Sequence, residues 1–459
     1  MTDHMNTRLT RRSFMASAAA ATLLPVAAQA SVPTLTARPG QIRLLPDEYP
    51  ETEVWGFDGQ VPGPLIRLNQ GQTLTRKLVN QLPAPTSIHW HGLRLPNAMD
   101  GVPGITQAAV QTGGDFTYSF TPPDAGTYWY HSHHQSTEQV ARGLYGVLIV
   151  DETEPPDVDH DLTVVLDDWR LTQDGKVSED FDRPHDWTHA GRLGNFIHTV
   201  TAPQLSRVQK NARLRLRLIN VATDRIMEIS LIGLEGKIVA FDGMPLLQPE
   251  NPEQLFIGPA QRVDLIVDVT AEEGEDALIA SHERDGVYAI AEFPVSGSGT
   301  HRGDIPALPD NPHHRLTTIK DARKVPLKME GGAMGGLREA TFKGERLSIQ
   351  EMVQLGQAWA FNGVVGMPDE PLLRLSTGET VMIEMVNDTA FAHAMHLHGQ
   401  HFQEVLADGS FGPLRDTLLM ARAETRTIAF RADAPGKWLL HCHMLSHAAA
   451  GMRTWLQVV

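Results

Sequence analysis

Cysteine is almost missing from this chain. Its 459 residues include one cysteine, Cys442, so no disulfide can form within the chain. Exported proteins usually use their cysteines in disulfide pairs, and a lone thiol in an oxidising compartment is a liability unless it is buried or bound to a ligand. Cys442 stands between His441 and His443, which makes metal binding the first hypothesis for it.

Several other features are absent, and each absence excludes a class of protein. No apolar run reaches the roughly 20 residues that a membrane-spanning helix needs, so we expect no membrane span. The formal net charge of −16 repels nucleic acid and anionic lipid, so neither is an expected partner. The chain has no P-loop and no Gly-x-Ser-x-Gly motif, which argues against nucleotide hydrolysis and serine-hydrolase chemistry.

The N-terminal residues have the pattern of an export signal. Arg11 and Arg12 precede an Ala-rich apolar stretch over residues 15–28, and Ala28-Gln29-Ala30 offers a cleavage site between small residues. We therefore predict a twin-arginine signal peptide over residues 1–30, export by the twin-arginine machinery and a periplasmic location. That pathway carries folded proteins, often with a cofactor.

A repeated strand pattern divides the rest of the chain. Three ten-residue alternating spans begin at Gly71, Asn211 and Gly378 and end at Asn80, Asn220 and Asn387. Apolar residues at every second position indicate half-buried strands, and the 39 Gly and 30 Pro are typical of turns between them. The prediction is an all-β chain of three β-sandwich domains, over residues 31–153, 154–299 and 341–459, with a linker or long loop at 300–340.

Histidine is concentrated in four His-x-His pairs, and imidazole is a common ligand of copper and zinc. The repeat places two of the pairs at equivalent positions, nine and eleven residues after Asn80 and after Asn387, whereas the second domain has Ile229 and Leu231 there. This predicts one site between domains 1 and 3 with domain 2 as a spacer. The eight residues are His89, His91, His131, His133, His396, His398, His441 and His443.

Strand alternation predicts a second metal site. Side chains alternate between the faces of a strand, so Cys442 points away from its two histidine neighbours and can meet His393 on the other face. His447 and Met452 follow shortly after and can complete the set. Two histidines, a thiolate and a weak thioether are the ligands of a blue-copper site.

With these motifs together, the sequence resembles the three-domain multicopper oxidases, the laccase-type family, and most of all its bacterial periplasmic members. The resemblance implies three cupredoxin-like Greek-key domains and four coppers per chain. It implies type 1 copper at His393, Cys442, His447 and Met452, and type 2 copper at His89 and His396. It implies one type 3 copper at His91, His131 and His443, and the other at His133, His398 and His441.

The resemblance also implies the reaction. Four one-electron oxidations of a small reducing substrate at type 1 copper would be coupled to reduction of dioxygen to water at the trinuclear centre. Cys442 and its covalent neighbours His441 and His443 would form a short path for electrons. Asp100 resembles the family's carboxylate beside the trinuclear centre, although an Asp before Gly is also typical of a turn.

Some positions depart from the family. Ala394 follows His393 where the family usually has Pro, and Ala448 follows His447 where copper-efflux members carry an acidic residue for proton delivery. Those members also have an Asp and a Met just before the first type 1 histidine and a Met-rich insert. Residues 387–392 of this chain contain no Met, and its counterpart of the insert is limited to Met329 and Met334, which we assign to a flexible loop.

Several alternatives stay open. The physiological reductant can be a phenol or aromatic amine, cuprous ion or manganous ion, and we expect a monomer. A copper-free scaffold of the same fold is disfavoured by the complete ligand set. A two-domain nitrite reductase is disfavoured by the histidine-free middle domain, and a zinc enzyme by the Cys-His-His-Met set.

Overall fold

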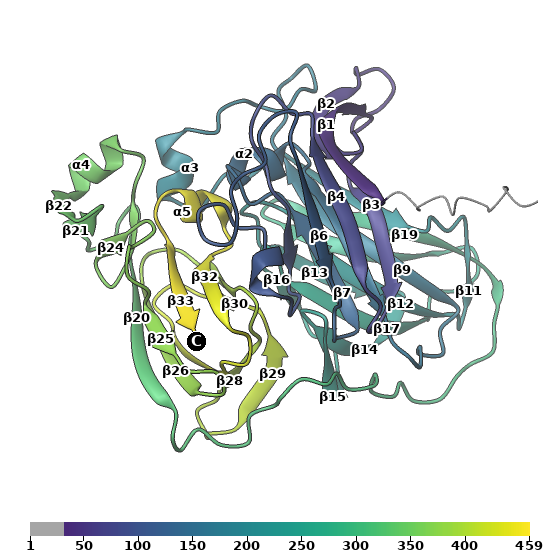
Figure 1. Ribbon diagram of the computed structural model, residues 1–459. Helices are drawn as coiled ribbons and strands as arrows, with labels where there is room; N and C mark the ends of the chain where they lie inside the picture. Colours follow the sequence, from purple (N-terminus) through teal and green to yellow (C-terminus); the bar gives the residue numbers. More distant parts are fainter. Residues whose placement is uncertain (1–31) are drawn as a thin grey trace, which may run out of the picture. The chain divides into compact units, whose positions relative to one another are not determined.

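The computed structural model describes residues 32–459, so the predicted signal peptide lies outside the described residues. In the described part the chain is almost entirely β-structure, as predicted, and each third of it builds its own sheets, coloured purple to blue, teal, and green to yellow (Figure 1). The short helices are η1 (Asn97–Met99), α2 (Ser136–Ala141), α3 (Pro184–Thr188), α4 (Ile349–Gln354) and α5 (Leu445–Ala449).

The first sandwich has two four-stranded sheets, ordered β2-β1-β4-β6 and β3-β8-β7-β5. Their strands are β1 (Thr34–Ile42), β2 (Thr52–Phe57), β3 (Gly63–Asn69), β4 (Leu74–Asn80), β5 (His89–His91), β6 (Asp115–Phe120), β7 (Gly126–His131) and β8 (Tyr145–Asp151).

The second sandwich has a six-stranded sheet, β10-β9-β12-β17-β14-β15, and a five-stranded sheet, β11-β19-β18-β13-β16. Their strands are β9 (His160–Trp169), β10 (Phe196–Ala202), β11 (Val208–Lys210), β12 (Arg213–Asn220), β13 (Met227–Ile232), β14 (Leu234–Phe241), β15 (Met244–Glu250), β16 (Leu255–Ile257), β17 (Arg262–Val269), β18 (Asp276–Glu283) and β19 (Gly286–Ser298).

The third sandwich has a nine-stranded sheet, β22-β21-β24-β23-β20-β26-β31-β28-β29, and a five-stranded sheet, β25-β33-β32-β27-β30. Their strands are β20 (Arg323–Gly331), β21 (Glu339–Phe342), β22 (Glu345–Ser348), β23 (Trp359–Phe361), β24 (Val364–Val365), β25 (Leu373–Leu375), β26 (Thr380–Asp388), β27 (His393–Leu397), β28 (Phe402–Val405), β29 (Phe411–Arg415), β30 (Thr417–Met420), β31 (Thr425–Arg431), β32 (Gly436–Cys442) and β33 (Arg453–Val458).

The three asparagines that end the sequence repeat have the same structural role. Asn80, Asn220 and Asn387 are buried, and each Oδ1 accepts a hydrogen bond from the backbone N–H two residues later. Each Nδ2 donates to two backbone carbonyls, one four or five residues later and one on a more distant segment. A buried backbone group must be paired, so one asparagine closes the corner at the end of each repeated strand.

The predicted linker at 300–340 is partly wrong. Residues 323–331 form β20, which pairs in parallel with β26 as β1 pairs with β4 and β9 with β12. Val325, Leu327 and Met329 alternate as in a strand, but Pro326 hides the pattern, and Met329 is a fully buried core residue, not part of a flexible loop. Met334 lies in the following loop and is 81% exposed.

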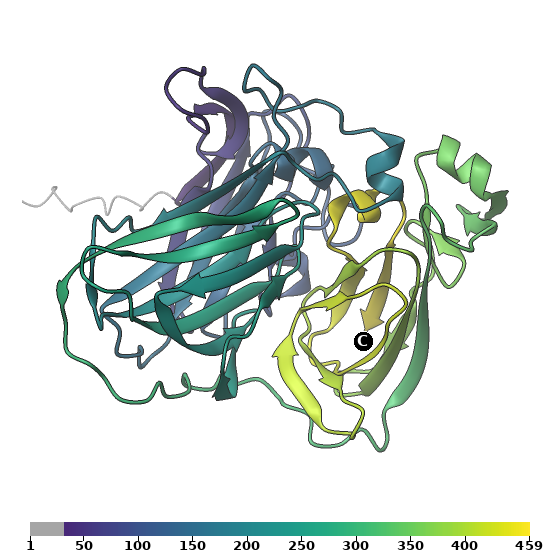
Figure 2. The same ribbon diagram turned by 180° about the vertical axis from the view of Figure 1, so that it is seen from behind.

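Residues 299–322 do form a long loop without helix or strand (Figure 2). The loop is held to the first sandwich, because the Asn311 side chain exchanges two hydrogen bonds of 2.8 Å with the backbone of Ala125. The exact domain boundaries stay a prediction.

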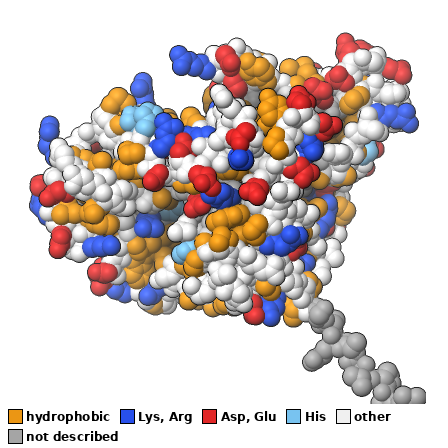
Figure 3. All heavy atoms as spheres, turned by 90° about the horizontal axis from the view of Figure 1, so that it is seen from above, with side chains coloured by type: hydrophobic (Ala, Val, Ile, Leu, Met, Phe, Trp, Pro, Cys, Tyr) orange, Lys and Arg blue, Asp and Glu red, His pale blue; other side chains and the backbone are white. Residues whose placement is uncertain are grey.

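No helix among residues 32–459 is both long and apolar enough to cross a membrane. On the face shown in Figure 3, acidic and basic side chains are interspersed. Ion pairs join many acidic and basic side chains of the described residues; for example, Arg67 binds both Asp151 and Asp161 at 2.7 Å.

Candidate metal centre

A cluster of three side chains is formed by His393 of β27, Cys442 of β32 and His447 of α5. The two strands are antiparallel neighbours, with Met395 opposite Cys442. Cys442 Sγ lies 3.7 Å from His393 Nδ1 and 3.8 Å from His447 Nδ1, and the two nitrogens are 3.1 Å apart. All three side chains are 0% exposed, so the structure brings together a thiol and two imidazoles in a buried site.

The other nitrogen of His447 is covered by the second sandwich. His447 Nε2 donates to the backbone carbonyl of His189, which follows α3, over 2.7 Å. The ring of His189 stacks on His185 at 4.0 Å, and both belong to the segment around α3. The hydrogen bond fixes the His447 ring so that Nδ1 faces the thiol.

The first sandwich has no such cluster at the equivalent place. The sequence has Thr86 where the third sandwich has His393, and Ser132 where it has Cys442. These two hydroxyls both donate to Gln139 Oε1, so a hydrogen-bonded polar triad fills the position. One cysteine–histidine cluster per chain follows.

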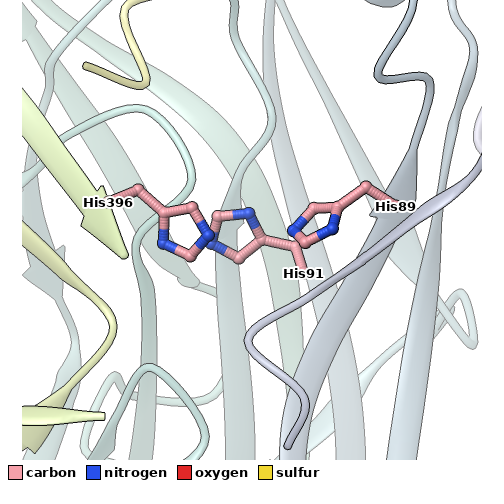
Figure 4. Close-up of side chains that lie close together, drawn as sticks. All are labelled: His89, His91 and His396. Carbon is pink, nitrogen blue, oxygen red and sulfur yellow. The ribbon is translucent and has the colours of Figure 1, made fainter. Parts of the chain in front are cut away.

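A larger cluster of eight histidines lies between the first and third sandwiches. His89 pairs with His131 across β5 and β7, and His396 pairs with His441 across β27 and β32, so each sandwich contributes the same arrangement. The rings of His91 and His396 stack across the boundary at 3.8 Å, and Figure 4 shows His89, His91 and His396 converging.

The ligand atoms of this cluster fall into three groups of histidines, each within 4.8 Å. The groups are His89, His91 and His396; His91, His131 and His443; and His133, His398 and His441. The family resemblance assigns the same histidines together, except that it assigns His91 to the second group alone.

Two aspartates bind the histidines of both sandwiches in a crosswise pattern. The Asp100 carbonyl accepts from His89 Nδ1 over 2.8 Å, while its carboxylate contacts His398 Nδ1 at 3.1 Å. Asp416 repeats this with the sandwiches exchanged: its carbonyl accepts from His396 Nδ1 over 2.9 Å, and its Oδ1 lies 3.1 Å from His91 Nε2. Asp100 was predicted at this place, whereas Asp416 was missed.

Comparison with known proteins gives the family. The family description "Multicopper oxidase" matches residues 40–155, 159–291 and 343–459. The chain is 32% identical to "Multicopper oxidase MmcO" of Mycobacterium tuberculosis, over 93% of this chain and 86% of that protein. The chain belongs to the multicopper oxidase family. It is therefore an oxidoreductase of a family that uses four coppers.

Other multicopper oxidase relatives are similar to this chain over nearly its whole length. The solved structure of Lac15 from a marine microbial metagenome is 44% identical, with a TM-score of 0.77 over 93% of this chain and all of that one. "Copper resistance protein A" of Pseudomonas syringae pv. tomato is 27% identical over 98% of this chain and 99% of that protein.

The donor atoms of this multicopper oxidase fit copper. The Nε2 atoms of His89 and His396 are buried without a hydrogen-bond partner among the described residues, while their Nδ1 atoms donate to carbonyls. His398 Nε2 and His441 Nε2 face each other at 3.2 Å although both rings donate through Nδ1, so both atoms present lone pairs. Two facing lone pairs call for a cation between them.

Burial favours the neutral forms of His447 and Cys442 in the protein alone. It lowers the pKa of His447 to about 4, and it raises the pKa of the Cys442 thiol. A metal is needed to hold Cys442 as thiolate. Burial and neighbouring imidazoles lower the pKa well below the ordinary value at His91, His131, His133, His393, His398, His441 and His443.

Met452 lies beside the cysteine cluster in the chain. It is fully buried, its backbone carbonyl accepts from Cys442 N–H over 3.1 Å, and its N–H donates to the His447 carbonyl over 3.0 Å. The copper-ligand roles of Met452 and the histidines remain predictions from the sequence.

Proposed function

We propose that this multicopper oxidase takes electrons from small aromatic reductants, as laccases do. The observation that carries the proposal is a cavity of about 230 Å³ beside the cluster of Cys442, His393 and His447. Its wall is mainly apolar, with Ala190, Leu193, Asp224, Arg225, Ile226, Phe391, Ala392 and Met444. Ala392 precedes His393, and Ala190 follows His189, whose carbonyl binds His447.

The charged groups of the cavity wall favour an organic substrate over a metal ion. Asp224 is buried, and its oxygens accept hydrogen bonds from the N–H and hydroxyl of Ser446 and from the N–H of Arg192. Arg225 binds Asp168 and Glu283. Manganous ion requires oxygen ligands that are free, whereas these carboxylates are already bonded. Cuprous ion prefers sulfur ligands, and the only thioether in the wall is that of Met444.

The proposed copper ligands are the residues predicted from the sequence. His393, Cys442, His447 and Met452 would hold type 1 copper, His89 and His396 type 2 copper, and the remaining six histidines the type 3 pair. When bound, the coppers supply a one-electron acceptor at the first site and the capacity to give dioxygen four electrons at the second. The chain contributes fixed imidazole orientations, and Cys442 links the two sites through its neighbours His441 and His443.

A second candidate is a cuprous-ion oxidase, because relatives of the chain include proteins named copper resistance protein A as well as laccases. Oxygen uptake distinguishes the two when it is measured with a phenol, an aromatic amine, cuprous ion and manganous ion, with and without added cupric ion. We expect the phenol and the amine to support uptake without added copper.

A variant that fills the cavity sharpens this test. Ile226→Trp should raise KM for the phenol by about tenfold or more, because the ring occupies the space of the substrate. Ile232→Trp, on an exposed position of the same sandwich, is the matched control and should leave KM unchanged. Fast uptake with cuprous ion and none with phenols would replace the laccase-like proposal with the second candidate.

A further inference from the structure

One side chain of the second sandwich reaches the histidine cluster, although that sandwich contributes no proposed copper ligand. Arg262 lies in β17 and is 0% exposed. Its Nη1 donates to Asp416 Oδ1 over 3.0 Å, and its Nη2 donates to Asp416 Oδ2 over 2.6 Å. Such a two-pronged contact fixes the plane of the carboxylate as well as its position.

Asp416 transmits this geometry to two proposed ligands. Its carboxylate contacts His91 Nε2 and its carbonyl contacts His396 Nδ1. A hydrogen bond at one imidazole nitrogen determines which nitrogen is left for a metal and which way the ring faces. The free nitrogens, His91 Nδ1 and His396 Nε2, both belong to the metal-ligand groups of the cluster and have no hydrogen-bond partner among residues 32–459.

The position of Arg262 is specified from all three sandwiches. Nε donates to the carbonyl of Thr127 in the first sandwich over 3.2 Å, and the backbone N–H donates to Asp242 Oδ1 over 3.0 Å. Gly92, which follows His91, has φ +84, and a Cβ there would lie 2.2 Å from Arg262 Nη2. The glycine next to the ligand is thus required for the arginine to reach Asp416.

The other aspartate of the crosswise pair has no comparable partner. Within residues 32–459, the ion pairs of Asp100 are with His89 and His398. Arg262 therefore acts on one half of an otherwise symmetric arrangement, the half with Asp416.

We infer that Arg262 is a positioning residue for the trinuclear centre, which fixes Asp416 and, through it, His91 and His396. The second sandwich is then part of the metal-binding machinery and more than the spacer that the sequence predicted.

The test measures how tightly copper is held, in the full mature chain loaded with copper. Arg262→Gln removes the two-pronged contact with Asp416, and Arg262→Lys keeps the positive charge without that contact. Arg217→Gln is the matched control, because Arg217 is also a buried arginine of the second sandwich and binds Thr127, Asp161 and Asp264 instead of Asp416. Copper per chain, the blue absorption and the type 2 electron paramagnetic resonance signal are followed during dialysis against graded chelator.

Arg262→Gln should stay blue but release type 2 copper at a chelator activity about 10- to 100-fold lower than the wild type. Arg262→Lys should release type 2 copper at a chelator activity between those of Arg262→Gln and the wild type. Arg217→Gln should hold copper as the wild type does even if it melts at a lower temperature. Wild-type copper retention in Arg262→Gln, or equal loss in Arg217→Gln, overturns the inference.

If Arg262→Gln fails to fold, Asp416→Asn serves in its place, because it preserves side-chain volume and removes the charge that Arg262 binds. It should also release copper from the histidine cluster at a lower chelator activity than the wild type and stay blue, because the carboxylate contacts His91 Nε2 and lies 3.3 Å from His396 Nδ1. Unchanged copper retention in this variant overturns the inference as well.

Discussion

At the scale of single residues, the centre depends on hydrogen-bond acceptors at the ring nitrogens that face away from the cluster. The Nδ1 atoms of His89 and His396 both donate to aspartate carbonyls, so the opposite nitrogens of these two rings face the cluster. The side chains of Asp100 and Asp416 then cross to the other sandwich. The two halves of the centre are therefore oriented by each other before any metal is added.

Asp100→Asn should slow oxygen reduction by about 100-fold or more, if its carboxylate delivers protons. Reduction of the type 1 copper by substrate should stay nearly unchanged, because the cysteine cluster has its own contacts. Stopped-flow measurement of the two half-reactions checks this. Asp124→Asn is the control, since Asp124 is a buried carboxylate of the same sandwich that binds Arg94. Equal slowing of both half-reactions would indicate a structural role in the turn.

Met452→Leu should raise the reduction potential of the type 1 site while the protein stays blue. A thioether donates weakly to cupric ion and stabilises the oxidised form, and leucine cannot donate. A redox titration at the blue band measures the shift. Met385→Leu makes the same volume-conserving change at a fully buried core position and should leave the potential unchanged. An unchanged or lower potential in Met452→Leu means that Met452 is not the axial ligand.

At the scale of elements, the repeated strand of each sandwich explains what the sequence could predict. Its alternating pattern and its terminal asparagine are local signals, so β4, β12 and β26 could be placed from sequence alone, and so could the histidine pairs that follow β4 and β26. β20 was missed because Pro326 interrupts its apolar alternation. Asp416 and Arg262 were missed because their contacts join residues 325 and 154 positions apart, and no local pattern marks them.

Asn387→Ala should lower the free energy of unfolding by at least about 2 kcal/mol, because two buried carbonyls and one buried N–H lose their partner. Denaturant unfolding of the copper-free protein measures the change without the contribution of bound metal. Asp388→Ala, at the neighbouring exposed position, removes a surface ion pair with Lys328 and should cost less than about 1 kcal/mol. Equal losses in the two variants would contradict the corner role of the asparagine.

At the scale of the whole molecule, the histidine cluster is complete only when the first and third sandwiches are folded and joined. His89 and His396, which come from different sandwiches, are more than 300 positions apart in the chain. Metal can therefore be bound at this cluster only after both sandwiches have folded. The predicted twin-arginine pathway, which carries folded proteins, would allow copper to be bound before export.

Replacing Arg11 and Arg12 with Lys should leave the protein in the cytoplasm, because the twin-arginine machinery reads that pair. Cell fractionation with an antibody against the chain measures the distribution, and the mature protein should begin at or near Ser31. The same replacement at Arg8 alone is the control and should not affect export. An unchanged periplasmic yield of the double variant would exclude the twin-arginine route.

The carbonyl of His189 over His447 has a consequence for how electrons enter. If His447 holds copper as proposed, a donor cannot hydrogen-bond to His447 Nε2, because the His189 carbonyl occupies that atom, and the electron must enter without that direct bond. For such outer-sphere transfer the rate is governed by driving force and distance, with little dependence on which functional group the donor presents. Across a series of phenols of similar size, the logarithm of the rate should then follow the donor's one-electron potential.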